Sequence, residues 1–329
     1  MSLLAPTLQA FFTERLIRQR QASPHTVAAY RDTFRLLFAY LAETTGTLPA
    51  ELDFADLDAA TIGAFLTHLE TDRGISVATR NARLAALRSM FRYASFHHPE
   101  HADLIQRVLA IPSKRVDRRI VCFLDRAEID ALLATPDRES WTGRRDHALL
   151  TVAIQTGLRV SELSALRRAD VVTGRGAHVR VKGKGRKERV TPLGAHSVGT
   201  LRAWLEERAG GPEDPVFPTP SGEPLGRDAI RKLVAKHASG AAKSCPSLAT
   251  KRVGAHTLRH SCAMNLLHAG VDLATIALWL GHEDLRTVQH YLHADLALKE
   301  RALARTSSPN SKPGRYRPPD RVLLFLESL

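Results

Sequence analysis

Two short stretches in the last third of the chain carry side chains suited to binding and cleaving a phosphate ester. The sequence AHTLRH at 255–260 places His256 and Arg259 three residues apart. On a helix, residues at this spacing lie on one face about a turn from each other. An imidazole and a guanidinium on one face can donate to the same anion, so the spacing predicts a phosphate site.

The residues that follow are predicted to fold back to the same place. Gly270 is a C-terminal signal for the helix that carries AHTLRH, and 272–280 predicts a second short amphipathic helix that Gly281 closes. His282 is therefore expected at a turn, and Tyr291 on a third helical segment. This arrangement would bring the phenol of Tyr291 into the pocket that holds the histidine and the arginine.

A metal site is the main alternative for these histidines. His256 and His260 are four residues apart, but Thr257 stands where the glutamate of a zinc-protease helix would be. Taken singly, each histidine also fits an ordinary surface or core role, and Tyr291 fits simple packing. Phosphate chemistry is preferred because a phenol, two histidines and an arginine occur together at short spacing.

Two more cations lie where the local structure is predicted to change sharply. A buried helix over 146–155 ends near Gly157, and Arg159 follows at the junction. Lys184 lies at the tip of the GKGRK hairpin, 183–187, where the flanking glycines allow close approach to a ligand. A solvated basic turn is an equally good interpretation of that hairpin alone. Short strands are predicted at 171–172, 178–181 and 189–191.

Composition favours a polyanionic partner. The 329 residues are 44% hydrophobic, enough for two domains with cores. Lys and Arg number 47 against 34 Asp and Glu, a net charge of +13, which favours nucleic acid as the partner. Three cysteines without paired spacing fit a reduced compartment. With no secretory leader and no apolar run of about 18 residues, a cytoplasmic protein without a membrane partner is expected.

Residues 1–110 are predicted to form an all-α bundle that binds DNA. Apolar stripes predict helices around 8–16, 24–41, 62–69 and 77–96. The last of these carries basic side chains off its apolar face, and no acidic residue lies between Arg73 and Glu100. Such an unpaired basic helix suits a phosphate backbone, although a merely solvated face is the alternative. Its candidate DNA contacts are Arg80, Arg83, Arg88 and Arg92.

A basic linker at 111–120 is predicted to separate the bundle from a second domain at 121–306. The linker combines a proline with four cations and no periodicity, and its charge suits a path across a nucleic-acid backbone. Asp125 and Glu128 predict a capping box at the first helix of the second domain. This domain is expected to be mainly α with a small antiparallel three-stranded sheet, and its Pro-rich stretch 211–224 to be a surface loop. Further candidate DNA contacts in the linker and the hairpin are Lys114, Arg115, Arg118, Arg119, Arg186 and Lys187.

Five motifs, in this order, resemble the tyrosine recombinase (phage integrase) family. They are TGLRVSEL at 156–163, GKGRKER at 183–189, HTLRH at 256–260, LGH at 280–282 and Tyr291. The similarity covers the bundle, which looks like the SAM-like core-binding domain of the family, and the second domain to about Arg305. It implies an enzyme, a site-specific recombinase or integrase, that acts on double-stranded DNA with inverted-repeat half-sites.

The resemblance also implies roles for individual residues at the phosphate. Tyr291 would attack a DNA phosphodiester, forming a 3′-phosphotyrosyl link and releasing a 5′-hydroxyl. Arg159 and Arg259 would clamp the nonbridging oxygens, to which His282 would add a hydrogen bond.

Proton transfer is the other part of the implied mechanism. Lys184 would protonate the leaving oxygen as a general acid, and His256 would assist proton movement near the nucleophile. Because the phosphotyrosine keeps the energy of the broken ester, no ATP or other cofactor is implied. Two arginines on the phosphate make a metal unnecessary as well.

The resemblance leaves the biological process open. An arm-binding domain of the lambda-integrase type is not expected, so the chain looks more like Xer-type or transposon-borne recombinases. Chromosome dimer resolution, phage integration and transposon mobility all remain possible. A type IB-like topoisomerase and a catalytically silent architectural protein are the alternatives from other classes. The family implies a homo-oligomer on DNA, a tetramer, with related recombinases as conceivable further partners.

The last residues, 307–329, form a tail that the simplest members of the family lack. Its Pro-rich part is expected to be extended and long enough to reach beyond its own domain. The final segment RVLLFLESL, 321–329, is too apolar for a free solvated end. Docking of this segment on a neighbouring protomer is the preferred interpretation, and docking on its own catalytic domain is the alternative.

Overall fold

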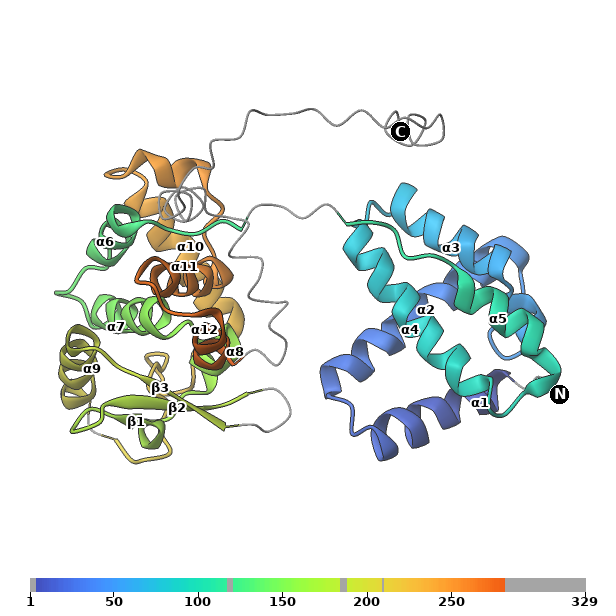
Figure 1. Cartoon of the computed structure of the whole chain (residues 1–329), viewed down its shortest axis with the longest axis horizontal. Coiled ribbons are helices and arrows are strands. Elements are labelled where there is room, and N and C mark those ends of the chain that lie inside the picture. Colours follow the sequence, from blue (N-terminus) through green and yellow to red (C-terminus); the bar gives the residue numbers. More distant parts are fainter. Residues whose placement is uncertain (1–3, 117–120, 184–187, 209, 282–329) are drawn as a thin grey trace, which may run out of the picture. The chain divides into compact units, whose positions relative to one another are not determined.

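The chain divides into two compact units, which are described separately. The computed structural model describes residues 4–116, 121–183, 188–208 and 210–281. A helical unit covers Met1–Arg118 and a sheet-containing unit covers Arg119–Leu329 (Figure 1). Mainly helical structure with one three-stranded antiparallel sheet confirms the predicted fold class. Within the described residues, no helix combines the length and the apolar character needed to cross a membrane.

The helical unit is a bundle around aromatic and aliphatic side chains. Its longest helix is capped by Ser23, whose Oγ accepts a 3.2 Å hydrogen bond from the backbone N–H of Thr26. That helix ends at Gly46, whose φ of 74° lies in the left-handed region. The helices are α1 (Leu4–Ala10), a π-helix (Phe11–Gln19), α2 (Pro24–Thr45), α3 (Ala59–Thr71), α4 (Val77–Ala94) and α5 (Ala102–Ala110). The sequence pattern did not predict α5, which has no side-chain cap at its N-terminus.

The sheet-containing unit places a small sheet at one edge of a group of helices (Figure 1). The strands lie in the order β1-β2-β3, and β2 and β3 pair Lys182 with Glu188 and Val181 with Arg189. The elements are α6 (Arg126–Ala134), α7 (Trp141–Thr156), α8 (Val160–Ala165), β1 (Val171–Val172), β2 (His178–Lys182), β3 (Glu188–Pro192), α9 (Ala195–Glu207), α10 (Arg227–Ala241), α11 (Ala255–His268) and α12 (Leu273–Leu280).

Helix α7 is the buried centre of this unit. Most of its side chains are inaccessible to solvent, and α9 and α11 both pack against it. Gly157 ends α7 with a φ of 63°, and Arg159 then begins α8, so the chain turns sharply between two buried segments. The predicted capping box of α6 is present: the side chain of Asp125 accepts from Glu128 N, and Glu128 accepts from Asp125 N.

The Pro-rich stretch 211–224 was predicted as a surface loop, and this prediction is wrong for 216–218, which are buried in the core. Val216 is 0% exposed and Phe217 is 1% exposed. The indole N–H of Trp204, in α9, donates a 2.8 Å hydrogen bond to Val216 O. Two apolar side chains between prolines therefore fill space that the sheet and α9 leave open. A composition rich in proline predicted the irregular backbone but not its burial.

Candidate active site

Arg259 is a buried cation that joins the ends of two helices. It lies on the second turn of α11 and is 4% exposed. Its Nη1 donates to Gly157 O at 2.6 Å and its Nη2 donates to Leu280 O at 2.6 Å. A buried charge requires such partners, because the desolvation of an unpaired ion is costly. The guanidinium is thereby fixed between the last residues of α7 and α12.

Arg159 reaches the same place from the start of α8. Its Nη2 donates to Gly281 O at 3.1 Å, and its Nη1 donates to Glu162 Oε1 at 2.9 Å. Leu280 and Gly281 are adjacent, so the guanidiniums of Arg159 and Arg259 hydrogen-bond to successive carbonyls. Residues that are 100 positions apart in the sequence thus converge at the C-terminus of α12.

Glu162 is the acidic member of this cluster, and Arg189 is its third arginine. The Glu162 side chain is 5% exposed. Arg189 Nη1 and Nη2 donate to its two carboxylate oxygens at 2.9 and 2.7 Å, and the backbone N–H of Arg159 adds a bond at 2.7 Å. Burial alone would raise the pKa of Glu162, but the hydrogen bonds and charges of Arg189 and Arg159 more than offset it and lower this pKa. The carboxylate is therefore ionised.

The histidines of α11 differ in exposure. His256, on the first turn, is exposed, and His260 is partly buried. Arg259, between them in the sequence, is buried. The rings of His256 and His260 lie with their centroids 6.4 Å apart. Burial, with the nearby charges of His256 and Arg259, lowers the pKa of His260 to about 4. His260 is therefore neutral at pH 7 and carries no charge for an anion.

Several predicted site residues fall outside the described part of the chain. They are Lys184, His282, Tyr291, Arg118, Arg119, Arg186 and Lys187. The described residues next to them are informative. Lys182 and Glu188 form the last described pair of the hairpin ladder, and Gly281, with a φ of 67°, closes α12 directly before His282. The two arginines of the described site thus hydrogen-bond to Leu280 and Gly281, the two residues directly before His282.

Metal ligation was the alternative for the histidines. Among the residues that the structure describes, no group of three or more His, Cys, Asp or Glu side chains is arranged to hold an ion. The polar groups around Arg159 and Arg259 are main-chain carbonyls and one carboxylate that two arginines already occupy. The site is built around cations, which suits an anion.

The sequence reasoning assigned no role to Glu162 or Arg189. Glu162 lies three residues after Arg159, a spacing that resembles a capping box, and this local signal could have identified the pair. Arg189 was predicted only as the first residue of a short strand and the last of the GKGRKER motif. Its contact with Glu162 joins β3 to α8 and has no local sequence signal.

The basic helix α4 of the helical unit is not the unpaired surface that the sequence predicted. Arg80 is 6% exposed, its Nε lies 3.8 Å from Glu70 Oε2, and its Nη1 donates to Pro112 O at 3.0 Å. The interpretation of Arg80 as unpaired is wrong, because its acidic partner comes from α3 rather than from α4. Lys114 Nζ also contacts Glu70, at 2.7 Å.

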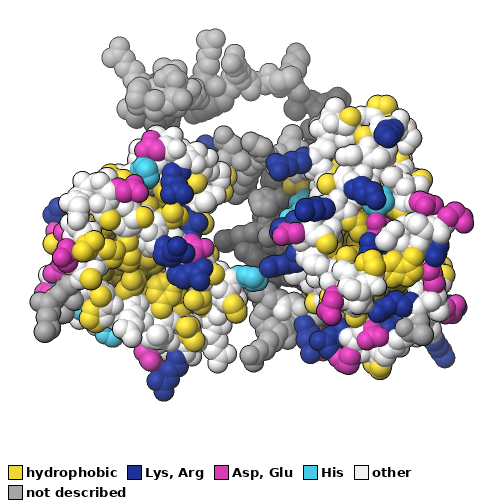
Figure 2. Space-filling view, turned by 180° about the vertical axis from the view of Figure 1, so that it is seen from behind, with side chains coloured by type: hydrophobic (Ala, Val, Ile, Leu, Met, Phe, Trp, Pro, Cys, Tyr) yellow, Lys and Arg dark blue, Asp and Glu magenta, His cyan; other side chains and the backbone are white. Residues whose placement is uncertain are grey.

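The other cations of α4 range from engaged to exposed. Arg83 donates to Ala29 O at 2.9 Å, and Arg88 donates to Ile111 O. Arg92 is exposed, as is Arg115, which follows α5. Figure 2 shows Lys and Arg side chains grouped on one face of the helical unit among apolar side chains.

Comparison with known proteins agrees with this arrangement. Residues 122–297 match the phage integrase family, and residues 10–96 match the phage integrase N-terminal SAM-like domain. A putative integrase/recombinase, y4rC, of Sinorhizobium fredii is 54% identical over 99% of this chain and 98% of its own length. Tyrosine recombinase XerC of Pelobacter propionicus is 34% identical over 87% of this chain and 90% of its own length.

Solved structures share the fold. The XerH site-specific recombinase bound to palindromic difH substrate superposes with a TM-score of 0.70 at 24% identity, over 87% of this chain and 81% of that one. A lambda integrase tetramer bound to a Holliday junction gives a TM-score of 0.60 at 18% identity, over 88% and 76% of the two chains. The family match spans most of the sheet-containing unit and includes both site arginines, and the N-terminal match agrees with the predicted SAM-like bundle. The chain therefore belongs to the phage integrase family and is a site-specific DNA recombinase of the tyrosine recombinase type.

Proposed function

We propose that this recombinase breaks and rejoins DNA strands through a covalent 3′-phosphotyrosyl intermediate on Tyr291. The observation that carries the proposal is the convergence of Arg159 and Arg259 on the carbonyls of Gly281 and Leu280. Two guanidiniums held at one point form a site for a single phosphate. The reaction is an exchange of one phosphate ester for another, so it needs neither ATP nor hydrolysis.

The two arginines supply electrostatic stabilisation. A phosphodiester carries one negative charge, and the nonbridging oxygens hold the charge that rearranges as the tyrosine attacks. Arg159 and Arg259 are always protonated and present planar forks that match these oxygens. Donors fixed before the reaction need no reorganisation when the charge develops, and this is commonly the largest contribution to catalysis. With this charge in place, the proposal requires no metal.

Three further side chains complete the proposed chemistry. The phenol of Tyr291 must lose a proton as it attacks, and the leaving 5′-oxygen must gain one. We assign the second step to Lys184 as general acid and assistance near the nucleophile to His256. His282 would donate a hydrogen bond to the phosphate. His260 is excluded from an acid role, since its pKa of about 4 leaves it neutral at pH 7.

The nucleophile can be tested on a nicked duplex whose cleaved fragment diffuses away and traps the covalent protein–DNA adduct. Tyr291→Phe should bind this duplex as the unmodified protein does and form no adduct. Tyr40→Phe, in α2 of the helical unit, is the matched control and should form adduct at the normal yield. Adduct formation by Tyr291→Phe would refute the assignment.

The metal-free mechanism is tested with a chelator. Excess chelator should leave adduct formation by the unmodified protein unchanged, and a loss of adduct that zinc restores would refute this mechanism.

The proposed substrate is double-stranded DNA that carries inverted-repeat half-sites. The net charge of +13 and the exposed cations of the helical unit suit the phosphate backbone. The division into a DNA-binding domain at 1–110, a linker at 111–120 and a catalytic domain at 121–306 is part of the same proposal. Exchange of flanking DNA between two such sites is expected, whereas a topoisomerase would relax supercoils without exchange.

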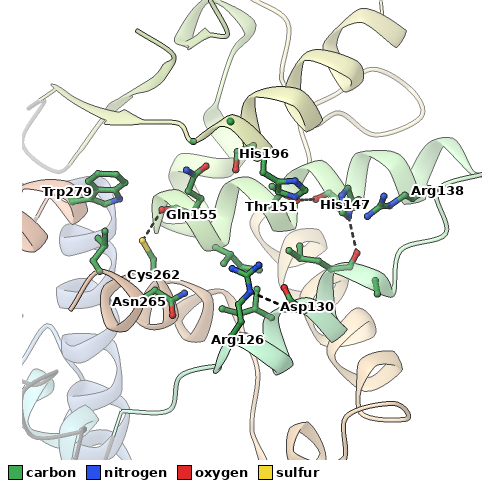
Figure 3. Close-up of a pocket in the computed structure, with 18 residues that line it drawn as sticks. Arg126, Asp130, Arg138, His147, Thr151, Gln155, His196, Cys262, Asn265 and Trp279 are labelled. Carbon is green, nitrogen blue, oxygen red and sulfur yellow. Dashed lines mark hydrogen bonds and ion pairs between the residues drawn. The ribbon is translucent and has the colours of Figure 1, made fainter. Parts of the chain in front are cut away.

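We further propose a tetramer on two paired sites, held by the tail of each protomer. A cavity of about 660 Å³ between α6, α7, α9, α11 and α12 is large enough for several side chains (Figure 3). Apolar side chains in its lining include Ile129, Leu133, Ile154 and Leu266. Arg138 and His196 add positive or polar groups, and Arg126 is paired with Asp130. This mixture suits the segment 321–329, which is mainly apolar and carries the acidic Glu327. A neighbouring protomer is the proposed donor of that segment.

A further inference from the structure

The third arginine of the cluster, Arg189, contacts three elements that carry the proposed active site. It belongs to β3, the strand that follows the hairpin of Lys184. Its two Nη atoms bind the Glu162 carboxylate at 2.9 and 2.7 Å, and its Nε donates to Trp279 O at 3.3 Å. Its side chain is 11% exposed. One guanidinium thus uses each of its three nitrogen atoms to join β3 to α8 and to α12.

The same side chain packs against the end of α12. A Cβ atom added to Gly281 would lie 3.0 Å from Arg189 Cδ and Nη1. Gly281 also has a φ of 67°, which L residues rarely adopt. Gly281, whose carbonyl accepts the hydrogen bond from Arg159, is therefore restricted both by its left-handed backbone and by its close contact with the Arg189 side chain.

Charge balance shows what Arg189 does for Arg159. Glu162 carries one negative charge and lies between two guanidiniums, each with one positive charge. Arg189 engages both carboxylate oxygens, whereas the guanidinium of Arg159 bonds only to Oε1, through Nη1, and the backbone N–H of Arg159 bonds to Oε2. The Nη2 of Arg159 is directed to Gly281 O instead. Without Arg189, both carboxylate oxygens would be available to Arg159, which could then bind Glu162 with its whole fork.

We propose that Arg189 is a positioning residue for strand cleavage: it occupies Glu162, so that the guanidinium of Arg159 remains available to the phosphate. This inference rests on the proposed function, in which Arg159 binds the scissile phosphate. Arg189 itself need not touch DNA. Arg189 acts on Arg159 only through the carboxylate of Glu162. A substitution of Glu162 must therefore change how much cleavage slows when Arg189 is lost.

A different role must be distinguished by experiment. Arg189 also follows the hairpin that carries Lys184, so it could act by placing the general acid instead. A substrate with sulfur in place of the bridging 5′-oxygen separates the two roles, because a thiolate leaves without being protonated. Cleavage of that substrate needs the arginines but not Lys184.

The first measurement is the single-turnover rate of adduct formation on the nicked duplex. Arg189→Met should slow it about 10²-fold, the size of effect produced by a misplaced catalytic group. The affinity for the duplex should change by less than about threefold, because Arg189 makes no contact with DNA in this proposal. Arg144→Met is the matched control: Arg144 also forms a fork with a carboxylate, that of Glu207, at 2.7 Å for both bonds, but on α7 and α9. Adduct formation by Arg144→Met should be as fast as that of the unmodified protein.

The decisive variant adds Glu162→Gln to Arg189→Met. A neutral amide cannot capture Arg159 as a carboxylate does, so the double variant should cleave at least about tenfold faster than Arg189→Met alone. A double variant as slow as Arg189→Met, or slower, would overturn the proposal. If Arg189→Met does not fold, Arg189→Lys serves in its place, because lysine keeps the charge but cannot form the paired bonds.

The sulfur-containing substrate supplies the last distinction. Lys184→Ala should regain most of its lost rate on it, while Arg189→Met should remain slow. Recovery of Arg189→Met would show that this residue acts through the hairpin and would refute the inference. Failure of the unmodified protein to form any adduct would instead refute the proposed function itself, so the two failures are distinguishable.

Discussion

Gly157 and Arg259 are joined by a 2.6 Å hydrogen bond from the guanidinium to the main-chain carbonyl. The end of α7 therefore fixes a side chain of α11. Gly157 has a φ of 63°, and a Cβ atom at this position would lie 2.6 Å from Leu280 Cδ2 and 3.2 Å from Cys262 Sγ. The glycine is required both by its backbone conformation and by close packing. Any shift here moves the carbonyl that holds Arg259.

Gly157→Ala should lower both stability and cleavage. The left-handed backbone and the contact with Leu280 should together reduce the free energy of unfolding by about 1–3 kcal/mol. Adduct formation on the nicked duplex should slow by about tenfold or more, because Arg259 moves with its carbonyl partner. Gly199→Ala, within α9, is the control: a Cβ there meets nothing within 4 Å. It should stabilise the protein by up to about 1 kcal/mol and leave cleavage unchanged. Equal behaviour of the two variants in urea unfolding would contradict this reading of Gly157.

The elements around the site were predictable because their signals are local. Helix α12 lies within the predicted range 272–280 and Gly281 closes it as predicted, with Asp272 as its N-terminal cap. The strands β2 and β3 pair across the glycine-rich hairpin as the change in period predicted. Caps, glycines and apolar periodicity act within a few residues, so one sequence is enough to identify them.

The partners of the site cations were not predictable in the same way. Arg189 and Glu162 are separated by 27 positions, and neither residue type indicates the other. Arg80 was interpreted as unpaired because α4 lacks acids, but Glu70 of α3 lies beside it. Ion pairs between elements depend on how helices pack, and a charge pattern along one helix contains no information on that packing.

The exposed Arg92 of α4 should contribute a phosphate contact to DNA binding, whereas an exposed arginine that is already ion-paired should not. Arg92 is exposed, so its replacement by alanine should remove one phosphate contact and reduce the slope of log affinity against log salt by about 0.9. Arg107, on α5, forms an exposed ion pair with Asp103 and serves as the control. Titration of a labelled half-site duplex at four salt concentrations measures both slopes. An unchanged slope for Arg92→Ala would remove this residue from the proposed DNA contacts.

Protonation of His260 should destabilise the protein in mild acid. Its pKa is about 4 in the folded protein, against an ordinary value of 6.5. Above pH 6.5 both folded and unfolded states are neutral here. Between pH 6.5 and pH 4 only the unfolded chain takes up the proton, so the free energy of unfolding falls as the pH falls and levels off below pH 4. At pH 5 the loss due to this histidine should be at most about 2 kcal/mol.

Urea unfolding at pH 7.5 and pH 5 tests this expectation. His260→Gln cannot bind a proton, so it should lose less stability between the two pH values than the unmodified protein. His147, whose pKa is also lowered, chiefly by burial, is present in both proteins and contributes equally. An identical loss in the two proteins would show that His260 does not titrate in this window.

The tail prediction concerns assembly. Deletion of residues 322–329 should leave the melting temperature of the isolated monomer and its binding to one half-site unchanged, if the segment docks on a neighbouring protomer. Cooperative occupation of paired half-sites and strand exchange should be lost, because burial of several large apolar side chains would contribute several kcal/mol to the contact, at about 25 cal/mol per Å². Arg138→Glu, at the exposed rim of the proposed receiving cavity, should weaken the same cooperativity by repelling Glu327. Gel shifts with one and two half-sites, together with thermal melting of the free protein, measure these quantities. A truncated monomer that melts at a much lower temperature would show instead that the segment packs against its own domain.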